Sequence, residues 1–254
     1  MSQTQPIPDQ RVISYMALRK AIGLIGIALP IVLAVIYMLL VSKLVLRGSV
    51  SDYYYTGSRD VLVGDLCAIG VFLFAYRGYG IWDNLYTNAA GVFAIGVAMF
   101  PTAPPDPSAT ATVVGYVHLA CAGLLFAMLA IIALFLFTTT DSRPGERPAR
   151  KRHRDTVYHI CGGVIVACLL LVPVESFVLG AAVARYQPLF WLETVAIVAF
   201  GLAWLVKGQA ILKDRGTPRS RPARGPAPLA RPGNWPASAA DRARVPPALA
   251  DSLL

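Results

Sequence analysis

The chain has 254 residues, 56% of them hydrophobic, a mean hydropathy of +0.57 and a formal net charge of +9. This composition is more apolar than that of ordinary soluble domains and predicts a protein that resides in a bilayer. The basic charge is compatible with nucleic-acid binding, but most Lys and Arg residues flank apolar segments or lie in the C-terminal tail. Nucleic acid is therefore not an expected partner.

Six apolar segments predict membrane-spanning helices, each of which needs about 20 residues to cross the hydrocarbon core. The predicted spans are residues 21–42, 61–76, 85–100, 113–137, 157–174 and 189–206. The first run is longer than the apolar core of a typical signal peptide, so we expect it to remain in the protein as a helix. The predicted fold is all-α, a six-transmembrane-helix bundle over residues 21–207.

Basic residues predict the orientation of this bundle, because Lys and Arg are retained on the cytoplasmic side. With six spans, 19 Lys and Arg residues fall on the side of the N-terminus, the loop holding Arg77, the segment 138–156 and the tail, against 4 on the other side. Both termini are therefore predicted to be cytoplasmic, with residues 1–20 before the bundle. Residues 208–254, rich in Pro, Ala and Arg, predict a largely disordered tail.

The basic loop and tail predict contact with anionic lipid headgroups. Within the spans, the small residues Ala90, Gly91, Ala94 and Ala98 form a stripe that predicts close packing between helices. Cys67, Cys121, Cys161 and Cys168 all fall within spans, without paired metal-site spacing, so we expect small packing residues and no disulfide.

The predicted topology gathers most of the unusual polar residues at the external end of the bundle. We expect these residues to form an external-facing polar pocket: Asp52, Tyr54, Arg59, Asp60, Asp65, His118, Glu175 and Glu193. Asp65 is the most informative, because an ionisable side chain inside a membrane helix costs about 2.5–3.5 kcal/mol and usually faces protein or a wet cavity. A structural hydrogen bond to another helix would account for Asp65 equally well.

The loop residues also fit purely structural roles. Asp60 lies where a carboxylate complements the dipole of a helix N-terminus, and Tyr54 with its neighbours Tyr53 and Tyr55 matches an interfacial aromatic belt. A catalytic zinc site usually has three protein ligands, and Asp65, His118 and Glu193 form an admissible but weakly supported set. No cofactor is expected otherwise. Neither Ser51 nor Ser58 lies in a G-x-S-x-G elbow.

Three segments carry a resemblance: SDYYYTGSRDVLVGDLCAIGVFLFAYRGY, NAAGVFAIGVAMFPT and FWLETVAIVAFGLAWLVKG. They resemble a family of six-helix bacterial membrane proteins without an assigned activity, which implies the same architecture. The expected location is a bacterial inner membrane. A more distant similarity is to the alkaline ceramidase and adiponectin-receptor membrane hydrolases. That similarity implies a site containing Ser51 or Ser58 with Asp65 and His118, but the paired histidines of those enzymes are missing from the last helix.

The sequence therefore predicts a membrane protein whose external pocket binds a lipid headgroup or a small solute. Three alternatives stay open: a metal-dependent lipid hydrolase, a proton-coupled transporter in which Asp65 and Glu193 line the path, and a structural scaffold. None of the motifs fixes a reaction, and the sequence favours a protein that is not an enzyme.

Overall fold

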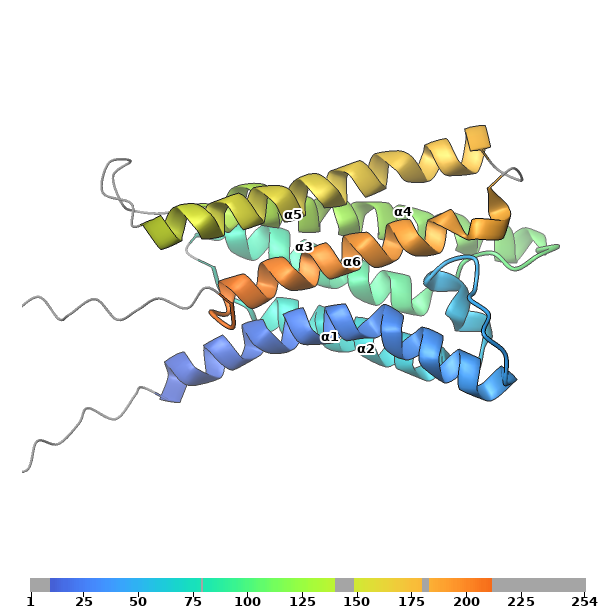
Figure 1. Cartoon of the computed structure of the whole chain (residues 1–254), viewed down its shortest axis with the longest axis horizontal. Coiled ribbons are helices and arrows are strands. Elements are labelled where there is room, and N and C mark those ends of the chain that lie inside the picture. Colours follow the sequence, from blue (N-terminus) through green and yellow to red (C-terminus); the bar gives the residue numbers. More distant parts are fainter. Residues whose placement is uncertain (1–9, 79, 140–148, 180–182, 212–254) are drawn as a thin grey trace, which may run out of the picture. The chain divides into compact units, whose positions relative to one another are not determined.

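The computed structural model describes residues 10–78, 80–139, 149–179 and 183–211, all within one compact unit (Figure 1). The segments 1–9 and 140–148, and the predicted tail beyond residue 211, lie outside the described residues. The described part is helical and contains six α-helices. Their bounds are α1 (Gln10–Val41), α2 (Arg59–Ala75), α3 (Ile81–Met99), α4 (Ala109–Ile131), α5 (Ala149–Val174) and α6 (Pro188–Lys207).

Short helical turns extend or connect these helices. The π-helical turns η2 (Ile132–Leu136) and η4 (Glu175–Leu179) continue α4 and α5. The 3₁₀ turns η1 (Ser51–Tyr55) and η6 (Ala184–Tyr186) lie before α2 and α6. Helices α1 and α5 begin about ten residues before the predicted spans, because the apolar run marks the hydrocarbon crossing while the helix continues into its polar flank.

Four helical stretches are long and apolar enough to cross a membrane: Tyr15–Val41, Ala109–Leu136, Lys151–Val174 and Pro188–Lys207. Helix α2 has only 17 residues, and α3 carries Asp83, Asn84, Thr87 and Asn88 in its first two turns. The structure therefore supports a multi-pass membrane protein. Whether α2 and α3 also span the bilayer depends on their place in the bundle.

The six helices form a ring in which each helix packs against its neighbours along the chain and α6 closes the ring on α1. Consecutive helices run in opposite directions (Figure 1). Each end of the ring takes its name from one of its residues. The Ser51 end carries the segments 42–58, 100–108, 175–179 and 183–187, and the Lys207 end carries the start of α1 and α5 and the ends of α4 and α6.

Glycines allow two of the helix pairs to approach closely. A Cβ atom on Gly201 of α6 would lie 2.6 Å from the carbonyl oxygen of Gly23 on α1, and one on Gly91 of α3 would lie 2.9 Å from that of Gly70 on α2. The predicted small-residue stripe of α3 is buried along its length. Gly64, in contrast, has no other atom within 4 Å of such a Cβ.

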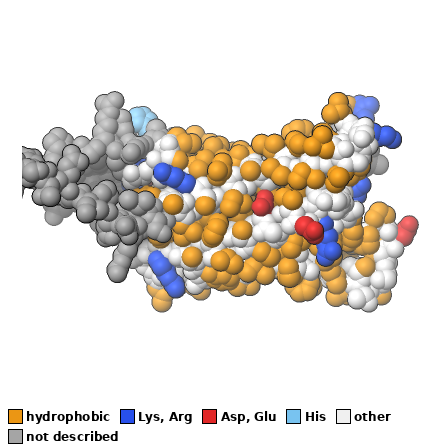
Figure 2. Space-filling view, turned by 90° about the horizontal axis from the view of Figure 1, so that it is seen from below, with side chains coloured by type: hydrophobic (Ala, Val, Ile, Leu, Met, Phe, Trp, Pro, Cys, Tyr) orange, Lys and Arg blue, Asp and Glu red, His pale blue; other side chains and the backbone are white. Residues whose placement is uncertain are grey.

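The outer surface of the bundle is apolar, as a lipid-facing surface must be. Figure 2 shows a face covered largely by hydrophobic side chains, with most charged groups toward its two ends. Large apolar side chains on several helices are more than half exposed, among them Leu24, Leu39, Leu119, Phe135, Ile160 and Leu170. A bilayer is the solvent that such a surface requires.

Gly201→Ala should destabilise the bundle by about 1–3 kcal/mol, because the new methyl group overlaps Ile27 and the Gly23 carbonyl. Thermal unfolding of the purified protein in detergent measures the effect as a lower midpoint. Gly64→Ala is the matched control and should leave the midpoint unchanged or raise it. Equal midpoints for the wild type and Gly201→Ala would contradict the close packing of α1 on α6.

Candidate functional site

The segment between α1 and α2 is fixed to the start of α6 by two hydrogen bonds. The backbone amide of Phe190 donates to the carbonyl oxygen of Gly48 at 3.0 Å. The amide of Val50 donates to Oε2 of Glu193 at 2.5 Å. A buried amide that loses such an acceptor is left unsatisfied, at a cost of about 1–3 kcal/mol. These two bonds, which we call the α6 clamp, determine where Ser51 and the turn η1 lie.

Tyrosines secure the rest of this segment. Tyr53 is fully buried, and its ring packs against Tyr37 and Phe190 at centroid distances of 5.6 and 6.2 Å. The Tyr55 hydroxyl donates to the carbonyl oxygen of Thr102 at 2.5 Å, which links η1 to the segment after α3. Burial raises the pKa of both tyrosines, so their hydroxyls stay protonated at neutral pH.

The α6 clamp brings Ser51 to His118 on α4. The distance from His118 Nε2 to Ser51 Oγ is 3.1 Å, and His118 Nδ1 lies 2.7 Å from the carbonyl oxygen of Phe100. A carbonyl oxygen only accepts, so Nδ1 carries the hydrogen, and Nε2 of the neutral ring accepts the Ser51 hydroxyl proton. His118 is 8% exposed, and both of its ring nitrogens have partners.

The Ser51 and His118 pair borders a cavity of about 350 Å³. This volume is within the range of small-molecule pockets, about 300–1,000 Å³. The polar lining comes from Ser49, Ser51, Thr102, Thr112, Tyr116, His118, Ser176 and Glu193, and the rest of the lining is apolar apart from glycines. No Lys or Arg belongs to this lining within the described residues. The cavity therefore combines hydroxyl groups, one imidazole and one carboxylate.

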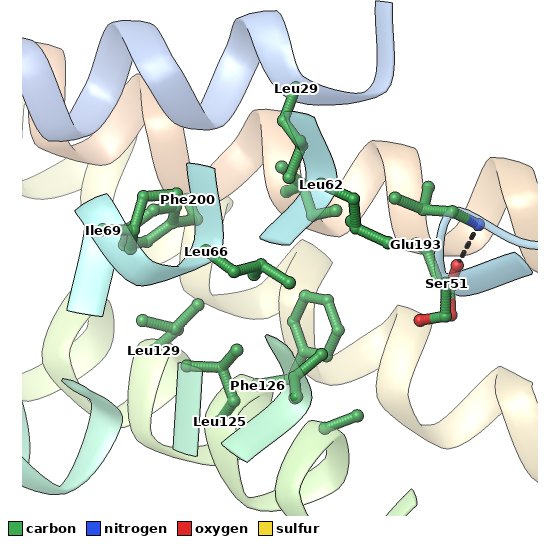
Figure 3. Close-up of a pocket in the computed structure, with 14 residues that line it drawn as sticks. Leu29, Ser51, Leu62, Leu66, Ile69, Leu125, Phe126, Leu129, Glu193 and Phe200 are labelled. Atoms are coloured by element: carbon green, nitrogen blue, oxygen red, sulfur yellow. Dashed lines mark hydrogen bonds between the residues drawn. The ribbon is translucent and has the colours of Figure 1, made fainter. Parts of the chain in front are cut away.

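A smaller apolar recess of about 60 Å³ adjoins this cavity and shares Ser51, Phe126 and Glu193 with it. Figure 3 shows Ser51 and Glu193 at one edge of the recess. Val97 of α3 lines the recess, and most of the other side chains come from α1, α2, α4 and α6: Leu29, Leu62, Leu66, Ile69, Leu125, Phe126, Leu129 and Phe200. Ser51 thus lies where the larger cavity, which holds most of the polar lining groups (the polar cavity) among apolar side chains, meets the apolar recess.

The structure brings together only part of the predicted pocket. His118 and Glu193 border the cavity, and Asp52 follows Ser51 in η1, where its carboxylate lies beside Gly48. The distant similarity to membrane hydrolases implied a site with Ser51 or Ser58 and His118, but no residue spacing in the sequence predicts the direct hydrogen bond between Ser51 and His118, which are 67 positions apart. One feature of the sequence points to a partner for the Phe100 carbonyl. The prolines that follow Phe100 end the helix, so this oxygen has no backbone amide of a next helical turn to accept from.

The remaining predicted residues lie elsewhere. The Arg59 guanidinium stacks over the Tyr54 ring at 4.5 Å and donates to its hydroxyl at 2.8 Å, so these two residues pair with each other at the surface. Asp60 is exposed in the first turn of α2, where a carboxylate complements the helix dipole as predicted. Glu175 lines a different cavity between α5 and α6, together with Trp191.

Asp65 does not line the cavity. It is half-buried on α2, one turn from Leu62. Within the described residues, no group of three His, Cys, Asp or Glu side chains is placed to hold a metal ion. Asp65, His118 and Glu193 therefore do not form a common ligand set, and the structure does not assemble the zinc site considered from the sequence.

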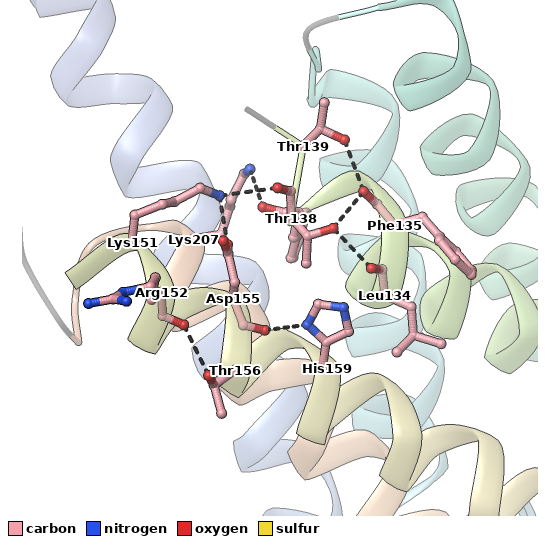
Figure 4. Close-up of polar contacts among 11 residues, drawn as sticks. Leu134, Phe135, Thr138, Thr139, Lys151, Arg152, Asp155, Thr156, His159 and Lys207 are labelled. Atoms are coloured by element: carbon pink, nitrogen blue, oxygen red, sulfur yellow. Dashed lines mark hydrogen bonds and ion pairs between the residues drawn. The ribbon is translucent and has the colours of Figure 1, made fainter. Parts of the chain in front are cut away.

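A second polar network lies at the Lys207 end (Figure 4). Lys151 forms an ion pair with Asp155 at 2.7 Å and donates to the carbonyl oxygen of Thr138 at 3.3 Å. The Lys207 ammonium donates to the carbonyl oxygen of Phe137 at 3.4 Å. The ends of α4 and α6 and the start of α5 are joined in this way, through carbonyls that a helix terminus leaves without intrahelical partners.

Arg19 connects α1 to the same network. Its guanidinium donates to the carbonyl oxygen of Lys207 at 3.4 Å and lies over the rings of Tyr15 and Tyr76 at 4.4 and 5.3 Å. Arg19 is 7% exposed, so this cation is held by aromatic faces and by the negative end of the α6 dipole. The network explains the closure of the ring between α1 and α6.

The chain matches no protein-family model, no curated protein and no solved structure. The resemblance to six-helix bacterial membrane proteins therefore stays a prediction.

Glu193→Met should release the segment before α2, because the Val50 amide loses its side-chain acceptor. The cost of about 1–3 kcal/mol for an unsatisfied buried amide predicts at least fivefold faster hydrogen exchange of the amides at residues 49–53. Hydrogen exchange with mass spectrometry on the purified protein measures this rate. Glu175→Met is the matched control at the same end, and equal exchange in both variants would show that the α6 clamp does not hold this segment.

Proposed function

We propose that this protein spans the bilayer six times and binds an amphipathic molecule, drawn from the membrane, in the cavity at its Ser51 end. The observation that supports this most is the junction of a polar cavity with an apolar recess at Ser51. A lipid has the same division between its headgroup and its acyl chains. A purely polar solute would leave the apolar part of the lining without a partner.

The ring supports six spans. Helix α1 ends and α4 begins at the Ser51 end, so the chain between them runs to the Lys207 end along α2 and returns along α3. The pair α2 and α3 packs between α1 and α4, which are long and apolar, and therefore lies at the same depth in the bilayer as these two helices. The short α2 can be accommodated by local thinning of the bilayer.

Charge supports an external position for the Ser51 end. The Lys207 end carries the buried Arg19 together with Lys20, Lys151 and Lys207, and basic residues are retained in the cytoplasm. Both termini are then cytoplasmic and the cavity opens toward the outer leaflet of a membrane, in a bacterium the inner membrane. Basic segments at the inner side favour contact with anionic lipid headgroups.

The rim of the cavity favours entry from the bilayer. Tyr116 and Leu119 of α4 line the cavity, and their side chains are 68% and 61% exposed. Both lie within a helix apolar enough to span the membrane. A ligand that enters between these side chains comes from the lipid phase.

The polar lining favours a headgroup that carries an amine. The Glu193 carboxylate borders the cavity, and the described lining contains no Lys or Arg to balance an anionic phosphate. A zwitterionic ethanolamine headgroup provides a cation for Glu193 and phosphate oxygens for the hydroxyl donors. An anionic glycerol headgroup provides no cation.

Cysteine labelling tests the orientation. In a background without the four native cysteines, Asp106→Cys at the Ser51 end should react with a membrane-impermeant maleimide added outside spheroplasts. Arg152→Cys at the Lys207 end should react only after permeabilisation. Both positions are exposed. The reverse pattern would overturn the proposed orientation.

A photoactivatable phosphatidylethanolamine tests the ligand. In vesicles of phosphatidylethanolamine and phosphatidylglycerol, we expect crosslinks to peptides of α4 and α6 that border the cavity. Gly123→Leu should reduce them at least tenfold, because Gly123 lines the cavity and a side chain there projects into open space.

Gly163→Leu is the matched control, since Gly163 of α5 is equally open and lies outside the described cavity lining. Competition by phosphatidylglycerol as strong as that by phosphatidylethanolamine would contradict the role of Glu193. Crosslinks spread evenly over the outer surface, in both variants alike, would contradict the binding site itself.

A further inference from the structure

The geometry points to a catalytic activity at this site: we propose that Ser51 is a nucleophile and His118 its general base, and that the pair cleaves a carboxylic ester of a lipid. The inference rests on the proposed binding of an amphipathic molecule. It adds the reaction, the bond that is cleaved and the residues that act on it.

The hydrogen bond between the two residues has the required direction. Ser51 Oγ lies 3.1 Å from His118 Nε2, within the reach of about 2.6–3.2 Å expected of a general base. Because Nδ1 donates to the Phe100 carbonyl, Nε2 presents its lone pair to the serine hydroxyl. A histidine in the other tautomer would donate to Ser51 and could not take its proton.

The base is held in place by a third group, as in other nucleophile and base pairs. The carbonyl oxygen of Phe100 accepts from Nδ1 at 2.7 Å, and His118 is buried against α3. This carbonyl takes the place that a carboxylate has in the serine protease triad. A neutral dipole stabilises the imidazolium less than a carboxylate does, so we expect slow turnover.

The position of Ser51 fits an ester of a lipid. The ester bond of a lipid lies between its polar headgroup region and its acyl chain, and Ser51 borders both the polar cavity and the apolar recess. The headgroup and glycerol fit the cavity beside Glu193. The first carbons of the acyl chain extend toward Leu66 and Phe126.

Hydroxyl donors border the place where negative charge develops. Ser49 and Thr102 both line the cavity with Ser51. The Ser49 oxygen accepts from the Asp52 amide at 3.0 Å, which leaves the proton of this hydroxyl to donate. Such donors stabilise the oxyanion of a tetrahedral intermediate when they are held in place before the reaction.

The first half-reaction forms an acyl-serine. Ser51 Oγ attacks the ester carbonyl carbon while His118 Nε2 takes the hydroxyl proton, and the electron pair of the C=O bond moves to the oxygen. The oxyanion then reforms the C=O bond and expels the alcohol oxygen, which leaves with the proton from Nε2. The acyl group is now bound to Ser51 through an ester.

Water completes the reaction. His118 takes a proton from a water molecule that attacks the acyl-serine, and the second tetrahedral intermediate expels Ser51 Oγ, which recovers its proton from Nε2. The products are a carboxylic acid and an alcohol, formed from one ester and one water. No oxidant or reductant takes part.

An alkyl fluorophosphonate, which phosphonylates activated serines, tests the nucleophile in the full-length protein in nanodiscs. We expect peptide mass spectrometry to place the label on Ser51 of the wild type, a result that needs no variant. Ser51→Ala should abolish the label. His118→Gln should slow labelling, and the hydrolysis of p-nitrophenyl octanoate, by about 100-fold or more.

Ser58→Ala is the matched control, because Ser58 lies at the same end of the bundle but outside the cavity lining, where its hydroxyl donates to the Leu33 carbonyl oxygen at 3.3 Å. It should label like the wild type. Labelling of another serine, or none at Ser51, would overturn the catalytic inference. If the phosphatidylethanolamine crosslinks persist in that case, the binding proposal stands; if they are lost as well, both fail.

Discussion

The α6 clamp is the interaction on which the rest of the site depends. The segment before α2 has no regular structure of its own apart from η1, and two hydrogen bonds hold it against α6, at Gly48 and Val50. The second uses the carboxylate of Glu193, a residue that an apolar helix would not otherwise tolerate. When these two hydrogen bonds are formed, Ser51 lies within hydrogen-bond distance of His118, and Ser51 and Glu193 both line the cavity.

The bilayer explains why apolar contacts dominate along the helices and polar contacts are found at the ends of the bundle. Apolar side chains face the lipid. Between helices, contacts at glycines allow close packing, because lipid tails are as apolar as the side chains and no hydrophobic force draws the helices together. The described polar contacts are concentrated at the two ends, where helix termini leave amides and carbonyls to be satisfied. Arg19 and Lys207 satisfy carbonyls at one end, and the α6 clamp satisfies an amide at the other.

Much of the architecture follows from composition alone. Apolar length predicted six helices at the places where the structure has them, and the stripe from Ala90 to Ala98 is buried as expected. The residues of the candidate site were predicted less completely from the sequence. Charge and depth singled out His118 and Glu193, which line one cavity, but the same reasoning added residues that do not line it: Tyr54, Arg59, Asp60, Asp65 and Glu175.

The sequence by itself determined the apolar surface, the helices and the placement of His118 and Glu193 toward the same end of the bundle, because these depend on local hydrophobicity and on the alternating direction of the helices. Only the tertiary structure decided which polar groups meet. The contact of Ser51 with His118 depends on the clamp at Glu193 and on the free carbonyl of Phe100, each from a different part of the chain. Such contacts arise from the ring of helices, and no local pattern encodes them.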